Sequence, residues 1–216
     1  MNRRATAIVL RSAAALGLLW GALGAVAIRN TRATRARAEE FLKDFTQFEV
    51  ANATRNDVTP LLSKYHGKWR TYGPYPPACC GPESSIAEFV FDNHWQHWIF
   101  FKPLTRLVAD IGINGNGVCD RSLSLLSFTK APFGILVQEF PNAQQPSPFL
   151  ARLNMFKTIT TLTTSATPVQ RAAAYSLDLN CLSKLAGCRD AREMAPGVWQ
   201  NSREVAPGDW VSQWSD

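Results

Sequence analysis

The chain has 216 residues, of which 46% are hydrophobic, and a formal net charge of +6. This length suits one domain of ordinary size with an appendage, and this hydrophobic content excludes a wholly disordered chain. The excess charge lies in residues 1–38, which contain seven arginines and no acidic residue, so the remainder carries 16 basic against 17 acidic residues. Because the folded part has no basic excess, no nucleic-acid partner is expected.

Residues 12–28, SAAALGLLWGALGAVAI, form an uncharged apolar run near the N-terminus. Extended back to Ala5, the run is interrupted only by Arg11, and a membrane span needs about 20 apolar residues. We therefore predict a basic cytoplasmic start at 1–11 and a transmembrane anchor at 12–28. A cleaved signal peptide is the alternative, because residues 25–27, Ala-Val-Ala, satisfy the small-x-small rule for cleavage. The length of the run and the arginines that follow it favour the uncleaved anchor.

The orientation of this anchor is predicted from the cysteines. Arginines flank both ends of the apolar run, so the positive-inside rule nearly cancels. Five cysteines in a domain of this size suit an oxidising compartment better than the cytosol. We expect a single-pass protein with its domain on the extracytoplasmic side.

After the anchor, residues 29–50 are expected to form a juxtamembrane amphipathic helix. Its apolar residues at positions 41, 42, 45 and 48 fall on one helical face. This helix either continues the anchor or follows it after a short break. Thr54 is expected to cap the next helix, which Gly67 ends. The exported domain is assigned to 51–192 and a Trp- and Pro-containing tail to 193–216.

Two resemblances bear on this region. Phe48–Gly67, FEVANATRNDVTPLLSKYHG, resembles the entry segment of small lipoproteins of outer-membrane assembly (the SmpA/OmlA type), in which a polar cap introduces D-V-x-x-L-L and a glycine stop. The whole chain resembles membrane-anchored exported bacterial proteins with an N-terminal span, a β-rich middle and a C-terminal Asn-Cys-Leu…Gly-Cys-Arg-Asp segment. The second resemblance implies a bacterial inner-membrane location and brings no activity with it. Another envelope protein is the candidate partner.

The middle of the chain is predicted to be a run of strands. The hydrophobic and β-branched patterns place them at 86–91, 107–113, 118–128, 133–140 and 155–163. Asn114-Gly115-Asn116-Gly117 is typical of a tight hairpin. Pro168 then opens a helix that leads into Cys181. The expected fold is α+β, with a four- to five-stranded antiparallel sheet and flanking helices.

The cysteines are predicted to form structural disulfides. Cys181 pairs with Cys188 if the helix breaks near Gly187, because two unbroken turns would hold the two residues about 10 Å apart. Cys119 pairs with either Cys79 or Cys80, which leaves one of that adjacent pair over. A thiol-redox centre at the pair is the alternative, although it lacks the C-x-x-C spacing of such sites.

His94 and His97 are the candidates for a metal site. Three-residue spacing puts both imidazoles on one face of a helix, whereas on a strand they would point to opposite faces. The chain contains no assembled catalytic signature, so we expect no cofactor and favour a membrane-tethered domain of structural or protein-interaction type. A metal-binding or thiol-redox enzyme, using His94 and His97 or Cys79 and Cys80, is the alternative.

Aromatic residues supply the interaction candidates. Trp95, Trp98, Phe100 and Phe101 are dense enough for a core cluster, which is the default reading, or for a patch at the membrane interface. The second reading makes the chain a bilayer-surface adaptor. Trp199 and Trp210 each end a copy of E-x-A-P-G-x-W at an 11-residue offset. Such turns either dock on the body or bind a partner.

Overall fold

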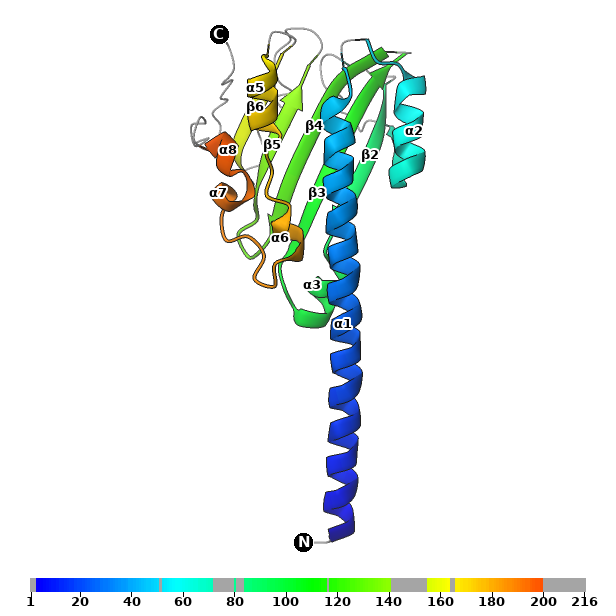
Figure 1. The fold of residues 1–216 in the computed structure, drawn as a ribbon, viewed down its shortest axis with the longest axis vertical. Coiled ribbons are helices and arrows are strands. Elements are labelled where there is room, and N and C mark those ends of the chain that lie inside the picture. Colours follow the sequence, from blue (N-terminus) through cyan, green and yellow to red (C-terminus); the bar gives the residue numbers. More distant parts are fainter. Residues whose placement is uncertain are drawn as a thin grey trace.

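The fold is a long N-terminal helix whose C-terminal half packs against a six-stranded sheet (Figure 1). The computed structural model describes residues 3–50, 52–71, 80, 84–115, 117–140, 155–163 and 166–199. The helix, α1, runs without interruption over Arg3–Gln47. Its N-terminal half projects away from the domain, so the molecule has an elongated stem and a compact head (Figure 1).

α1 changes character along its length. Large side chains from Ile8 to Leu23 are exposed on all sides, whereas from Gly24 onward one face becomes buried at steps of three, four or seven residues. The buried residues of this face are Gly24, Ala27, Thr31, Ala38, Phe41 and Phe45. That spacing is the pattern of a helix packed along one stripe. The two expected segments, 12–28 and 29–50, thus form one helix with no break, and it ends at Gln47.

The sheet follows the order of the strands in the chain. Its strands are β1 (Lys68–Thr71), β2 (Ser85–Asp92), β3 (Leu104–Asn114), β4 (Gly117–Phe128), β5 (Phe133–Glu139) and β6 (Phe156–Leu162). The first four pairings are antiparallel, and β5 pairs with β6 in parallel. The expectation of four or five strands, all antiparallel, is therefore wrong in two details. β1 is a four-residue edge strand with no clear alternation, and the direction of β6 depends on the long connection after β5.

The larger of two hydrophobic clusters lies between one face of the sheet and the helices, and a smaller one contains Leu136, Phe156 and Ile159 of β5 and β6. α1, α2 (Arg55–Tyr65), α5 (Pro168–Ala174), α6 (Asn180–Ser183) and α7 (Ala191–Met194) all contribute buried residues to the larger cluster. Phe41 of α1 occupies its centre. The Phe41 ring centroid lies 4.8–5.2 Å from four other aromatic rings: Phe45, Tyr65, Phe89 and Phe91. The C-terminal half of α1 is thus the central helix of the domain and not an appendage to it.

α2 is held at both ends. Thr54 forms a capping box with Asp57, as expected for its N-terminus. At the other end His66, and not Gly67, takes the left-handed conformation (φ 56°). Gly67 is required for a different reason, because a Cβ there would lie 2.6 Å from Leu62 and 2.7 Å from Phe89. The Lys64 ammonium joins α2 to α1 by an ion pair of 2.9 Å with Asp44.

The expected single helix after Pro168 is divided. Thr167 caps α5, which ends at Ala174, and a stretch without helix separates it from the four-residue α6. The chain then turns back at Gly187, whose φ of +66° favours glycine. α7 and α8 (Pro196–Trp199) follow. These breaks place the C-terminal segment over the sheet beside α1 (Figure 1).

Candidate functional site

α3 (His94–Phe100) packs against α1 at the point where α1 enters the domain (Figure 1). Gly24 of α1 is buried there, and a Cβ on it would lie 3.1 Å from the ring of Phe100. Ala27, one turn further on, has no exposed surface. The last residues of the uncharged run are therefore already part of the head. A mature chain beginning at Ile28 would lack Gly24 and would therefore lose this contact with Phe100.

The outer side of α3 carries three exposed aromatic side chains. Trp95 is 54% exposed, Trp98 64% and Phe101 86%; we refer to these three as the α3 patch. The default expectation that the aromatic cluster is core is wrong for them. Phe100 alone turns inward against α1. Because exposed apolar patches often mark contact sites, the α3 patch is a candidate contact surface.

The sequence around α3 explains why these three side chains face outward. Trp95 and Trp98 are three residues apart and share a helical face, and Phe101 continues that spacing in a left-handed cap (φ 52°). Asn93 is buried before the helix, where its Oδ1 accepts from the Thr105 backbone N–H at 2.8 Å and its Nδ2 donates to the Pro103 carbonyl at 3.3 Å. These bonds join the residue before α3 to the segment after it, at the start of β3.

The two histidines lie on α3, so they have the helical spacing that a metal site requires. His94 is exposed, and the Nδ1 of His97 hydrogen-bonds with the Lys102 carbonyl. Both rings lie beside the Trp98 ring, with centroids 5.8 Å and 6.5 Å away. Within the part of the chain that the structure describes, they share no cluster of three ligand-type groups. Both histidines therefore border the α3 patch.

The one such cluster among the described residues contains Cys80, Cys119 and Asp120. Its two sulfur atoms are joined in a disulfide, with a Cα–Cα distance of 5.3 Å. Cys119 is the extra residue of a β-bulge, because Gly112 and Ile113 of β3 pair with Asp120 and Val118. Cys79 lies outside the described residues. The structure thus presents Cys80 as a structural bridge between the preceding loop and β4.

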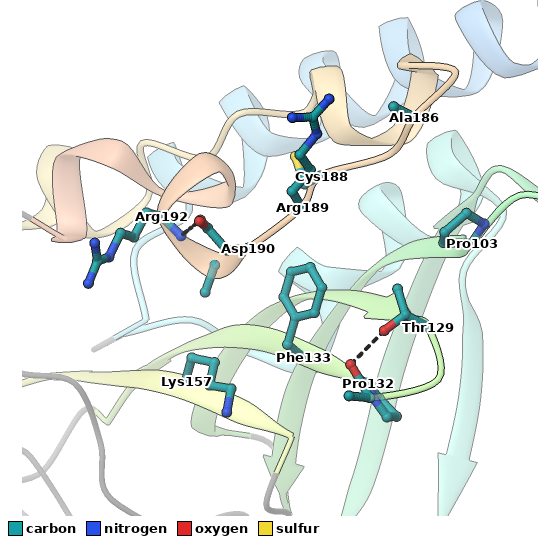
Figure 2. Close-up of a pocket in the computed structure, with 12 residues that line it drawn as sticks. Pro103, Thr129, Pro132, Phe133, Lys157, Ala186, Cys188, Arg189, Asp190 and Arg192 are labelled. Carbon is teal, nitrogen blue, oxygen red and sulfur yellow. Dashed lines mark hydrogen bonds between the residues drawn. The ribbon is translucent and has the colours of Figure 1, made fainter.

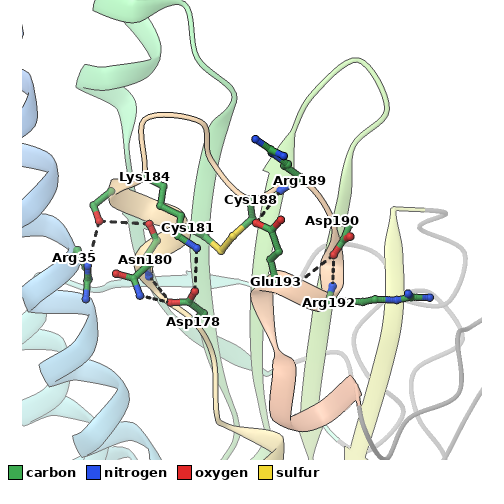
Figure 3. The surroundings of a disulfide bond; sticks show 11 residues. Arg35, Asp178, Asn180, Cys181, Lys184, Cys188, Arg189, Asp190, Arg192 and Glu193 are labelled. Atoms are coloured by element: carbon green, nitrogen blue, oxygen red, sulfur yellow. Dashed lines mark hydrogen bonds and ion pairs between the residues drawn. A yellow bond between two sulfur atoms is a disulfide. The ribbon is translucent and has the colours of Figure 1, made fainter.

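The second disulfide, Cys181–Cys188, closes the C-terminal segment with a Cα–Cα distance of 5.0 Å (Figure 3). Arg35 of α1 pairs with Glu39 at 2.7 Å and donates to the Ser183 hydroxyl at 3.4 Å. On the other side of the bridge the Asp190 carboxylate accepts from two backbone N–H groups of α7, at 2.8 and 3.1 Å. The bridge therefore fastens α6 and the start of α7 to each other, next to α1.

A cavity of about 670 Å³ opens between the β4–β5 turn and the segment that follows α6 (Figure 2). Its rim includes three cations, Lys157, Arg189 and Arg192, while Pro103 and Phe133 line its wall. The carboxylate of Asp190, which also lines it, is engaged in capping α7. No pair of groups suited to nucleophilic or acid–base catalysis converges among the described lining residues. Reading the sequence alone did not identify this cavity.

A buried ion network ties the end of α1 to the sheet. Arg121 of β4 pairs with Glu139 of β5 and donates to the Phe48 carbonyl at 2.9 Å. Glu139 also pairs with Arg171 of α5 and accepts from the Tyr175 hydroxyl at 3.1 Å. The sequence signal for it was an arginine and a glutamate inside apolar strands, which sequence analysis did not use.

The remaining interaction candidates have little structural description. Trp199 is the last residue of α8, and Trp210 lies outside the described residues. Comparison of the chain with protein-family models, with curated proteins and with solved structures finds no match.

Proposed function

We propose that this chain is a single-pass protein of the bacterial inner membrane whose extracytoplasmic head has a structural or protein-interaction role. α1 is an N-terminal helix long and apolar enough for an anchor or a signal sequence. The two disulfides fit an oxidising, extracytoplasmic environment for the head. These features support tethering, and the lack of a converged catalytic pair around the described cavity and the α3 histidines supports a non-enzymatic role.

The observation that carries the proposal is that one helix serves as both stem and core. A cleavable signal or a flexible tether needs no contact with the domain that it delivers. Here Gly24 and Ala27, at the end of the uncharged run, are buried against the head. An uninterrupted helix from the stem to Phe45 gives the head a fixed direction relative to the membrane. Such rigid mounting suits a protein that positions a surface for a partner.

Membrane extraction tests the tether. We expect the full chain to stay in the membrane pellet after carbonate washing and the head to be digested by protease added to spheroplasts. Leu19→Arg, in the exposed stem, is expected to weaken insertion, because arginine near a span's centre costs about 2.5–3.5 kcal/mol. Val169→Arg, at an exposed apolar site outside the stem and away from α3, is the matched control. A soluble mature chain starting near Ile28 would contradict the proposal.

A further inference from the structure

Exposed apolar side chains of the head gather at one end. Outside α1, the large exposed hydrophobic residues among those described are Val90, Trp95, Trp98, Phe101, Val169 and Leu185. Three of them make the α3 patch. Leu185, 52% exposed, precedes Ala186, which lines the same cavity as Pro103 at the exit of α3. Four of the six therefore lie on two neighbouring segments, α3 with its C-terminal cap and the segment after α6.

These two segments lie at the end of the head from which the stem emerges. Leu104 at the start of β3 pairs with Phe128 at the end of β4, so the α3–β3 connection and the β4–β5 turn share that end of the sheet. α3 is the part of the head nearest to the free half of α1 (Figure 1). The β3–β4 hairpin lies at the opposite end.

The length of the stem sets the depth of α3. A hydrocarbon core about 30 Å thick is crossed by about 20 helical residues. Counting 20 residues from Ala5, where the apolar run that only Arg11 interrupts begins, ends at Gly24. α3 packs on Gly24, which places it at the outer boundary of that hydrocarbon core. Tryptophan and other aromatic side chains are enriched at this level of a bilayer.

Cationic side chains accompany the patch. Lys102 follows α3, Lys130 is exposed in the β4–β5 turn and Arg189 is exposed beside the cavity. On α1 itself, Arg29 and Arg32 are exposed just beyond the uncharged run. Cations at this level face lipid phosphates, and each near an anionic surface is attracted to it. An apolar α3 patch flanked by cationic side chains matches a bilayer interface better than it matches a soluble apolar partner.

We propose that the α3 end of the head inserts into the outer interface of the same bilayer that α1 crosses. Trp95, Trp98 and Phe101 lie at headgroup level with Leu185 beside them, and the cations contact the phosphates. The head then stands with its β3–β4 hairpin directed away from the membrane. This inference rests on the proposed membrane tether and adds the surface and the lipid partner that fix the orientation of the head.

Lipid-borne quenching tests the insertion with the full chain in nanodiscs of phosphatidylcholine and phosphatidylglycerol. Bromine atoms placed high on the acyl chains quench tryptophan emission only at short range. The wild type carries Trp20 in the stem, so its quenching reports the tether. In a Trp20→Phe variant that signal is removed, and we expect quenching to persist through Trp95 and Trp98. Adding Trp95→Phe and Trp98→Phe should abolish it, with folding preserved because both side chains are exposed.

The outcomes separate the two proposals. Quenching in the wild type but not in the Trp20→Phe protein would leave the tether intact and overturn the insertion of α3; the patch would then be free for a protein partner. Quenching that survives in the triple variant would also overturn it, because another tryptophan would be the one near lipid. No quenching in any variant would remove the tether itself. Val169→Ala, at an exposed apolar site away from α3, should change nothing.

Discussion

Glu139 is the residue on which the buried polar contacts of the head converge. Its carboxylate pairs with Arg121 and Arg171 and accepts from the Tyr175 hydroxyl, and its side chain is 3% exposed. The Arg121 guanidinium lies 5.0 Å from the ring centroids of both Phe45 and Tyr175. A carboxylate in this position neutralises charge that would otherwise be buried alone.

Removing that carboxylate should therefore destabilise the head strongly. Glu139→Gln keeps the shape of the side chain but leaves Arg121 buried without its counter-ion. We expect a loss of about 3–5 kcal/mol in the free energy of unfolding, measured by denaturant titration of the full chain in nanodiscs. Glu49→Gln, at an exposed position just after α1, is the control and should be nearly neutral. A loss below about 1 kcal/mol for Glu139→Gln would show that the ion network is dispensable.

Asp110 is a second residue whose environment has a measurable consequence. It lies opposite Glu88 in the β2–β3 register. Burial, together with the carboxylates of Glu88 and Asp120, raises the pKa of Asp110 to about 7 from a value near 3.8, and Arg70 opposes the shift. Between these two pH values the folded chain holds a proton that the unfolded chain has lost. Stability therefore falls as pH rises through this window and stays lower above it.

Asp110→Asn removes this pH dependence, because asparagine does not titrate. Relative to the wild type, the variant should gain about 2.7 kcal/mol of stability between pH 5 and pH 8, since the wild type loses about 1.4 kcal/mol for each of the roughly two pH units between pH 5 and the pKa of Asp110 near 7. Thermal unfolding of both proteins at the two pH values measures it. Parallel stability profiles for the two proteins would contradict the assigned ionisation.

At the scale of elements, the two disulfides close loops of very different length. Cys80 and Cys119 are separated by 39 residues in the sequence, and Cys181 and Cys188 by 7. A crosslink stabilises mainly by restricting the unfolded chain, and the effect grows with the logarithm of loop length. The bridge that closes the longer loop should therefore contribute more to stability.

Paired Cys→Ser variants measure this difference. We expect removal of Cys80–Cys119 to cost about 4 kcal/mol and removal of Cys181–Cys188 about 2.5 kcal/mol. Each value is the shift in unfolding free energy of the double-serine variant, with peptide mapping to verify that the other bridge is intact. The reverse order would indicate that contacts of the C-terminal segment with α1, such as Arg35 to Ser183, outweigh the loop entropy.

The elements also show what the sequence could and could not predict. Strong local patterns predicted β2 to β6, the Asn114–Gly117 hairpin and the capped start of α2 closely. The parallel direction of β6 was missed because it depends on a long connection and not on the strand's own residues. The sequence left the aromatic residues of α3 with two readings, core or exposed patch, because burial is a tertiary property. Only the packing of α3 on α1 determines that Trp95 and Trp98 remain outside.

At the scale of the whole molecule, α1 unites two roles that the sequence separated. Composition alone distinguished an uncharged run from an amphipathic helix, and the change at Arg29 suggested a boundary. In the structure the buried face runs across that position from Gly24 to Phe45. The stem, the core and the α3 patch are therefore one continuous arrangement, so under the proposed tether the position of the stem in the bilayer sets the orientation of the head.

Hydrogen exchange along α1, measured by mass spectrometry on protein isolated from native membranes into nanodiscs, tests this most directly. We predict that the chain retains its N-terminal helix and that amide protection is continuous from about Ile8 through Arg29 to Phe45. Slow exchange across residues 24–37 would be the signature of one helix serving as anchor and core. Rapid exchange in that interval, or a mature chain that begins near Ile28, would contradict it.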